Sequence, residues 1–152
     1  MKAVVQRVRE ASVQVGAEVA GAIGPGLLVL LAVERGDGDR ELELMARKIA
    51  GMRVFADANG RMNLSLGESG GALLVVSQFT LAANLSKGMR PSFERAEEPE
   101  SARRTCERFC QRLEAAGIPV SRGRFGADMR VALINDGPVT FVLDFPPPHS
   151  RP

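Results

Sequence analysis

Two uninterrupted apolar runs constrain the fold of this chain more than any other feature of its sequence. The first is G-L-L-V-L-L-A-V at residues 26–33, and the second is A-L-L-V-V at residues 72–76. An apolar run of this length without polar alternation is typical of a strand that is buried on both faces. We therefore expect both segments to lie in the interior of a sheet.

Alternating or short apolar stretches predict further strands around these two runs. They lie at residues 2–8, 11–15, 53–55, 62–66, 130–134 and 139–145, with another short strand near Val120. Periodic apolar stripes predict two helices, at residues 40–50 with Asp39 as the N-cap and at residues 99–116 with Gly117 as the stop. Strands dominate, so the predicted class is α+β with largely antiparallel pairing.

Length and charge narrow the class of protein. The 152 residues are enough for one domain, and 20 Lys and Arg residues against 18 Asp and Glu residues leave a net charge of only +2. A sequence-independent nucleic-acid binder usually carries a denser basic stripe. The start of the chain lacks the apolar core of a signal peptide, and no apolar run reaches the roughly 18 residues of a membrane span. We expect a cytoplasmic protein.

Conventional catalytic groups are missing from the sequence. The only histidine is His149, in a Pro-rich tail, so neither a Ser-His-Asp nor a Cys-His arrangement is available. Cys106 and Cys110 share one face of the second predicted helix, where they are expected to be core residues rather than metal ligands. Hydrolytic chemistry would need backbone N–H groups, a hydroxyl without a histidine, or a group on the substrate.

Three polar segments remain as candidate sites, each with a structural alternative. S-Q-F-T-L at residues 77–81 is either a strand end or the lip of a pocket, and a continuing strand would put Ser77 and Phe79 on the face opposite Gln78 and Thr80. K-G-M-R-P-S-F at residues 87–93 is either a solvated loop or a phosphate contact. N-D-G-P-V-T at residues 135–140 is either a hairpin turn or a functional loop in which the proline removes a donor.

These segments, in this order and together with G-R-F-G-A-D-M, resemble the D-aminoacyl-tRNA deacylases. The opening M-K-A-V-V-Q-R-V and the stretch G-R-M-N-L-S-L extend the resemblance, which covers residues 1–145. Residues 146–152 are then a Pro-rich tail that we expect to be disordered. The resemblance implies a compact, barrel-like α+β domain that works as a homodimer without metal or cofactor.

The resemblance also implies an activity and its partners. The enzymes of this family hydrolyse the ester that joins a D-amino acid to tRNA, and they clear glycine from mischarged tRNA. The expected partners are therefore D-aminoacyl-tRNA and a second copy of the chain, with no membrane and no DNA.

Carried over residue by residue, the family's motifs assign a role to each segment. Gly137 and Pro138 would form a cis peptide that enters the other subunit's pocket, binds the substrate α-amino group and leaves no room for an L side chain. Residues 77–81 would form the catalytic wall of the pocket. The Phe79 backbone N–H, beside Gln78 and Ser77, would bind the oxyanion. Thr80 has been considered as the nucleophile in the family. The remaining roles fall to Phe125 and Met129, near the terminal adenosine, and to Lys87 and Arg90, which would contact tRNA.

One position departs from the family pattern. The loop after S-Q-F-T-L has Asn84 where the family often has Asp, followed by the unusual Leu85. If that aspartate positions a cation or the loop, its role is altered here.

Two mechanisms and two other classes of function stay open. Thr80 as nucleophile competes with hydrolysis assisted by the vicinal ribose hydroxyl, which we favour because no base is present to activate Thr80. A non-catalytic binder of RNA 3′ ends would bind tRNA without turnover. A general small-ester hydrolase would need an activated nucleophile that the sequence lacks.

Overall fold

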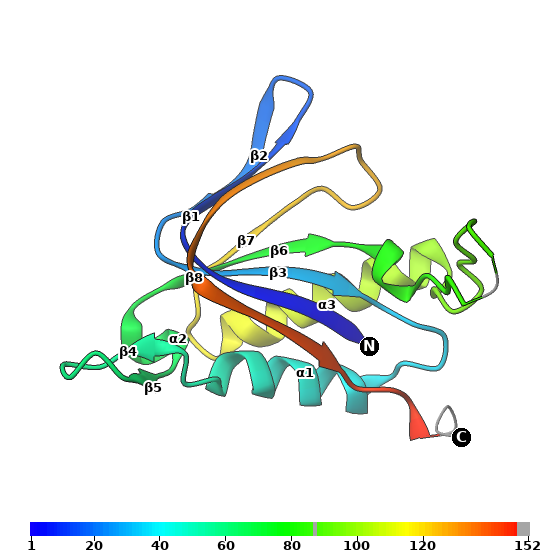
Figure 1. Cartoon of the computed structure of the whole chain (residues 1–152). Helices are drawn as coiled ribbons and strands as arrows, with labels where there is room; N and C mark the ends of the chain where they lie inside the picture. Colours follow the sequence, from blue (N-terminus) through cyan, green and yellow to red (C-terminus); the bar gives the residue numbers. More distant parts are fainter. Residues whose placement is uncertain (87, 149–152) are drawn as a thin grey trace.

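The computed structural model describes residues 1–86 and 88–148 (Figure 1). The helices and strands follow in the order β1 (Lys2–Val15), β2 (Glu18–Ile23), β3 (Gly26–Ala32), α1 (Asp39–Gly51), β4 (Phe55–Ala56), β5 (Met62–Leu64), α2 (Leu66–Ser69), β6 (Ala72–Ser77), the 3-10 turn η1 (Phe79–Ala82), α3 (Pro99–Ala115), β7 (Val120–Arg122) and β8 (Arg130–Asp144). The class is α+β, with α1 and α3 as the two main helices.

One six-stranded sheet organises the molecule around the long strand β1. The strand order is β2-β1-β3-β6-β7, and β8 pairs with the remaining edge of β1. The first half of β1 pairs with β3 and its second half with β2, while β8 follows nearly its whole length. The sheet curls until β7 approaches β2, where Ser121 Oγ donates a hydrogen bond of 3.0 Å to the Ala22 carbonyl. The result is a nearly closed, barrel-like sheet.

The inner strands of this sheet pair in parallel, and the sequence did not predict this pairing. All ladders of β1 are antiparallel, but β3 pairs parallel with β6, and β6 pairs parallel with β7. The two apolar runs are these inner strands, and six of the seven residues of β3 are buried, as predicted. Strands buried on both faces are typical of parallel sheets, whose crossover connections carry helices over the sheet.

Helices α1 and α3 lie together on one face of the sheet (Figure 1). They run in the same direction, because Arg108 pairs with Asp39 at 2.6 Å and Arg112 pairs with Glu43 at 2.8 Å. The main core lies between these helices and the sheet and includes Val29, Leu31, Leu42, Met45, Ile49, Leu73, Phe109 and Leu113. A second cluster on the other face contains Val8, Ala11, Val13, Leu28, Leu74 and Val76.

Two helix predictions need correction. Asp39 is the first residue of α1 and not its cap; the N-cap is Gly38, whose N–H donates to the Glu41 carboxylate at 3.0 Å. The carboxylate that closes the helix start therefore comes from the third helical residue, as in a capping box. The short helix α2, capped by Ser65, was not predicted, whereas α3 has the predicted start and ends one residue earlier.

The hairpin interpretation of residues 135–140 is wrong. The two strands predicted on either side form one strand, β8, and both halves pair antiparallel with β1. Residues 136–139 stand opposite Arg7, between the pairs Gln6–Thr140 and Val8–Asn135. A hairpin would reverse the chain, whereas this bulge keeps its direction and pushes the extra residues out of the ladder.

Candidate active site

A cavity of about 460 Å³ opens where β3 and β6 end beside the start of α3. This volume lies within the usual range of ligand pockets. Its wall combines the ends of two strands, the start of η1, the first turns of α3 and three loops. The residues that form it are Leu31, Ala32, Val33, Arg35, Ser77, Gln78, Phe79, Phe93, Ala96, Glu97, Glu98, Pro99, Ala102, Cys106, Phe125 and Gly126. Three residues of the S-Q-F-T-L segment are thus brought to one cavity.

The S-Q-F-T-L segment leaves the sheet at its second residue. β6 ends at Ser77, the Gln78 N–H donates to the Leu31 carbonyl at 2.7 Å, and the chain then enters the 3-10 turn η1. The face alternation expected for a continuing strand is therefore lost. Phe79 begins the turn, and the first N–H groups of a helical turn have no acceptor inside it. This backbone N–H is suited to stabilise an oxyanion in the cavity.

Thr80 is exposed and is not part of the cavity wall. In the described structure its hydroxyl oxygen accepts a hydrogen bond from the side-chain amide of Gln78. An amide is not a base, so this contact orients the hydroxyl without activating it as a nucleophile. The geometry therefore favours a chemistry that does not pass through Thr80.

Aromatic side chains form the open side of the cavity. The rings of Phe79 and Phe93 lie 5.0 Å apart between centroids and are tilted by 58°. Phe79 is nevertheless 59% exposed and Phe93 38% exposed, and Phe125 contributes a third ring to the wall. Exposed rings around a cavity are suited to stack on a flat aromatic ligand.

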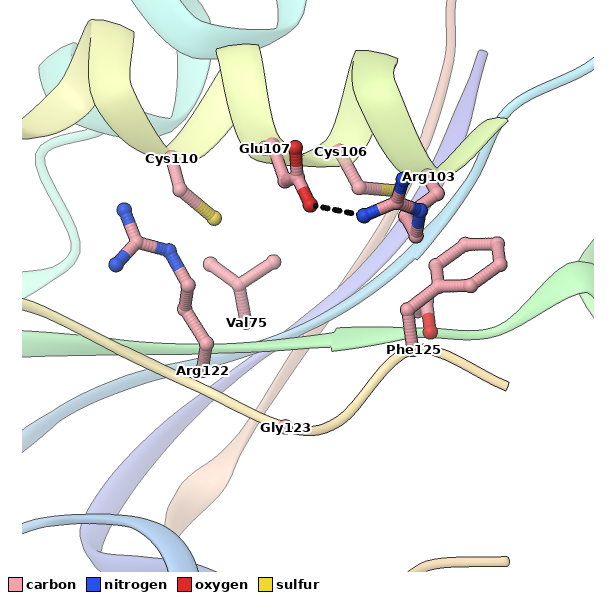
Figure 2. Close-up of a pocket in the computed structure, with 9 residues that line it drawn as sticks. Val75, Arg103, Cys106, Glu107, Cys110, Arg122, Gly123 and Phe125 are labelled. Atoms are coloured by element: carbon pink, nitrogen blue, oxygen red, sulfur yellow. Dashed lines mark hydrogen bonds and ion pairs between the residues drawn. The ribbon is translucent and has the colours of Figure 1, made fainter. Parts of the chain in front are cut away.

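A smaller cavity of about 120 Å³ adjoins the first and shares Ser77, Cys106 and Phe125 with it. Figure 2 shows Arg103, Cys106, Glu107 and Cys110 of α3 facing Val75, Arg122 and Phe125 across it, with an Arg103–Glu107 ion pair of 3.1 Å. Burial, reinforced by Cys110 and Glu107, raises the pKa of Cys106 to about 12. Both thiols are therefore neutral core groups, as predicted. No group of three or more potential ligands is arranged for a metal within residues 1–86 and 88–148.

The Gly137–Pro138 bulge forms a second candidate site. The peptide bond between these residues is cis, and both are exposed. Asn135 Nδ2 donates to the carbonyls of Arg7 at 2.9 Å and of Val139 at 3.1 Å, and Arg7 Nε donates to the Asp136 carbonyl at 2.9 Å. A Cβ at Gly137 would lie 2.0 Å from the Val139 nitrogen, so only glycine fits this backbone.

The structure brings some of the predicted residues together and separates others. Ser77, Gln78, Phe79 and Phe125 share the cavity of about 460 Å³, whereas Gly137 and Pro138 are not part of its wall. Met129 is not in that wall either; it packs against the second core cluster, behind the loop that carries Phe125. Arg90 is exposed on the loop between η1 and α3. Lys87 and residues 149–152, including His149, lie outside the described residues.

Most residues of the cavity wall were not predicted as site residues, and Phe93 and Arg35 are the most informative of them. Phe93 and Arg35 reach the cavity from loops, and nothing in their local sequence shows that these loops meet. Asn84 holds one of the loops closed: its backbone forms two hydrogen bonds with Ser92, of 2.8 and 3.0 Å, and its side chain accepts from the Ser86 N–H at 2.9 Å. An aspartate has an equivalent acceptor, so the loop-positioning role survives with asparagine.

Comparison with known proteins supports the resemblance along nearly the whole chain. The family model described as D-Tyr-tRNA(Tyr) deacylase matches residues 4–144. A D-aminoacyl-tRNA deacylase from Magnetococcus marinus is 60% identical over 148 residues, which cover 97% of this chain and 98% of that relative. One from Aeromonas hydrophila is 56% identical over 143 residues, which cover 94% and 99%.

Solved structures share the same architecture. One described as c-Myc DNA Unwinding Element Binding Protein has a TM-score of 0.91 at 44% identity and covers 96% of this chain and 99% of its own. A probable eukaryotic D-amino acid tRNA deacylase has a TM-score of 0.81 at 19% identity, covers 95% and 98%, and shows the fold alone.

Proteins similar to this chain over nearly all of its length are aminoacyl-tRNA ester hydrolases, and the protein is an enzyme of that class. Within this class, the chain belongs to the D-aminoacyl-tRNA deacylase family. None of the helices described is long and apolar enough to cross a membrane.

Proposed function

We propose that this protein hydrolyses the ester bond of D-aminoacyl-tRNA, and that of glycyl-tRNA formed by mischarging, to release free tRNA and the amino acid. The observation that carries the proposal is the cavity at the end of β6, where the Phe79 backbone N–H begins a turn beside three aromatic rings. The cavity offers an oxyanion donor and stacking surfaces. Such a site suits an ester that is already activated and attached to a nucleoside.

The proposed reaction uses the substrate's own hydroxyl. Water adds to the ester carbonyl carbon, and the negative charge that develops on its oxygen is stabilised by the Phe79 N–H, a type of contact worth roughly 10²–10³ in rate. The bond from this carbon to the ribose oxygen then breaks. The proton lost by the water reaches the leaving ribose oxygen through the vicinal ribose hydroxyl. This route agrees with the unactivated Thr80 hydroxyl.

Chiral selection in this proposal needs a second copy of the chain. Gly137 and Pro138 of that copy would enter the cavity, where their carbonyls bind the α-ammonium group and their backbone excludes an L side chain. Support comes from their exposure and from their separation from the cavity of their own chain. Because only backbone atoms would contact the substrate around its α-carbon, the enzyme would accept D-amino acids with many different side chains.

The terminal nucleotide of the tRNA would occupy the aromatic side of the same cavity. Phe125 and Met129 would lie near its adenosine. Lys87 and Arg90 would approach the RNA backbone from the loop before α3, and a charged tRNA substrate fits the expected cytoplasmic location.

A set of three assays separates this proposal from the alternatives. We expect release of free tRNA from D-tyrosyl-tRNA and from glycyl-tRNA, and no turnover of simple activated esters such as p-nitrophenyl acetate. Binding of D-tyrosyl-tRNA without release would instead identify a binder of RNA 3′ ends. Turnover of simple esters at a rate independent of RNA would identify a general esterase.

A further inference from the structure

Two arginines lie on paired segments beside the large cavity, and one of them, Arg35, lines its wall. The segment after β3 pairs with the segment before α3 through an antiparallel bridge between Glu34 and Ala96. Its hydrogen bonds run from the Arg35 N–H to the Arg95 carbonyl at 2.8 Å and from the Glu97 N–H to the Val33 carbonyl at 3.0 Å. Arg35 and Arg95 are therefore the opposite residues next to this isolated bridge, and opposite residues of an antiparallel pair place their side chains on the same side.

Like charges placed directly opposite each other destabilise a strand pair unless a counter-charge is present. Both arginines are exposed, and neither forms an ion pair with a carboxylate anywhere in the described parts of the chain. Arg35 belongs to the cavity wall, and its Nε donates to the Ala96 carbonyl at 3.2 Å. This bond orients the guanidinium and leaves the donors on both Nη atoms for another acceptor.

In the described residues, the neighbouring carboxylates form no ion pair with Arg35 or Arg95. Glu97 and Glu98 are also in the cavity wall, but their carboxylates accept from the backbone at the start of α3: Glu97 from the Glu98 N–H at 2.9 Å, and Glu98 from the Glu100 and Ser101 N–H groups at 3.2 and 3.4 Å. The arginines of α3 are different from Arg35, because Arg103, Arg104, Arg108 and Arg112 each pair with a carboxylate.

We propose that Arg35 and Arg95 form a phosphate clamp that holds a phosphodiester of the tRNA 3′ end at the mouth of the cavity. This inference rests on the proposed function, because the cavity must hold the terminal nucleoside for its phosphate to reach the mouth. A guanidinium matches a phosphate with paired N–H donors, and a phosphate between the two arginines would neutralise their repulsion. The clamp would fix the strand without reading its sequence.

The clamp is tested with two substrates that differ in phosphate. One is D-tyrosyl-tRNA, and the other is the 3′ D-tyrosyl ester of adenosine, which carries the same reacting group and base but no phosphate. The variants are Arg35→Ala, Arg95→Ala and Arg35→Lys. The matched control is Arg47→Ala on α1, which removes an equally exposed charge without a described ion pair and outside this cavity. Thermal melting confirms that each variant is folded.

For Arg35→Ala and Arg95→Ala we expect kcat/KM on D-tyrosyl-tRNA to fall about tenfold, the effect of one charge-assisted hydrogen bond to an exposed phosphate. We expect kcat/KM on the adenosine ester to be unchanged, Arg35→Lys to recover part of the loss, and Arg47→Ala to match the wild type on both substrates. The slope of log affinity for tRNA against log salt should fall by roughly 0.7 for each lost phosphate contact.

Equal losses on both substrates would overturn the clamp, because Arg35 would then act on the cavity itself. An unchanged kcat/KM on tRNA would overturn it as well, and so would a loss in Arg47→Ala as large as that in Arg35→Ala. If the wild type hydrolysed neither substrate, the proposed function would fail. The affinity of the four variants for uncharged tRNA, with its salt slope, would still decide whether the clamp binds phosphate.

Discussion

At the scale of single residues, Thr80 decides between the two mechanisms. Its hydroxyl accepts from the Gln78 amide, and no other side chain among the described residues is hydrogen-bonded to it. We therefore expect Thr80→Ala to keep kcat within about tenfold of the wild type, since a lost orienting hydrogen bond contributes only about 1 kcal/mol. The measurement is single-turnover release from D-tyrosyl-tRNA. A variant that binds tRNA normally but has lost all turnover would make Thr80 the nucleophile.

Gly137 is the residue at which the bulge tolerates no side chain. A Cβ there meets the Val139 nitrogen at 2.0 Å and Asn135 Oδ1 at 2.9 Å, so Gly137→Ala must displace the backbone of the bulge. We expect about 1–3 kcal/mol of lost stability, as for other overpacked sites, together with a large loss of turnover. The control is Gly67→Ala in α2, where a Cβ meets nothing within 4 Å. Denaturant unfolding and turnover assays compare the two; equal behaviour would contradict the account.

The Cys106 thiol is predicted to be inert in the folded protein. Burial raises its pKa from 9.0 to about 12, so the neutral form is favoured in the folded state. Iodoacetamide at pH 8 should leave Cys106 unlabelled until the protein is denatured, as measured by mass spectrometry of its peptide. The thiol ionises more readily in the unfolded chain, so the free energy of unfolding should decline as the pH rises from 9 toward 12. Rapid labelling of the native protein would refute the raised pKa of this half-buried thiol.

From local pattern alone, the candidate site was predictable only where its residues are contiguous, and Phe125 was expected through the family resemblance. Ser77, Gln78 and Phe79 follow a buried strand directly, and the end of that strand fixes where they lie. Arg35 and Phe93 depend on the meeting of two loops, which no local pattern records. Met129 is half-buried against the second core cluster, and its expected place near the adenosine stays a prediction.

At the scale of elements, the start of α1 depends on the Glu41 carboxylate. This group is buried and accepts from the Gly38 N–H at 3.0 Å and from Arg40 at 2.7 Å. Glu41→Gln should lower the free energy of unfolding at pH 7 by about 1 kcal/mol, because the charged acceptor at the helix N-terminus is lost. The control is Glu43→Gln, whose exposed pair with Arg112 is expected to contribute less than about 0.5 kcal/mol.

The contribution of Glu41 to the free energy of unfolding should decrease as the pH falls. Burial alone would raise the pKa of Glu41, but the Gly38 N–H and the Arg40 guanidinium outweigh it and hold this pKa below 4.5. The stabilisation is therefore fully present above pH 4.5 and is lost as the pH falls through the folded pKa. Urea unfolding at pH 7 and below pH 4 should show the wild type and Glu41→Gln converging in acid. A constant difference would contradict this origin.

Helices and buried strands were predictable because their patterns are local. The apolar stripe of α3 and the apolar runs of β3 and β6 can each be recognised within one short stretch of sequence. Pairing is not local: nothing in these runs states that β3 and β6 are parallel neighbours. The continuity of β8 was missed for a similar reason, since Asn135 and Arg7 hold the bulge in the ladder through contacts between distant residues.

At the scale of the whole molecule, the account requires a homodimer with shared sites. Large exposed apolar side chains such as Val142, which is 76% exposed on β8, are available for contact with a second copy. Sedimentation should give twice the 16.3 kDa mass of one chain. A monomer with full activity would contradict the cross-subunit role of Gly137 and Pro138.

Mixing two inactive variants tests directly whether each site is built from residues of both subunits. Gly137→Ala removes the bulge contribution, and the double variant Phe79→Ala, Phe93→Ala removes the aromatic pair of the cavity. After subunit exchange, half of the dimers are hybrids, and each hybrid has one intact site of two, so about a quarter of wild-type activity should return. No recovery, with hybrid dimers confirmed by mass spectrometry, would place both groups in one chain's site.

The central claim is that the enzyme removes D-amino acids from tRNA while sparing L-amino acids, without a metal. The most direct test is a time course of free tRNA release from D-tyrosyl-tRNA and L-tyrosyl-tRNA in the presence of EDTA. The account predicts rapid release from the D substrate and none above background from the L substrate. Equal release from both substrates, or none from either by folded and dimeric protein, would contradict it.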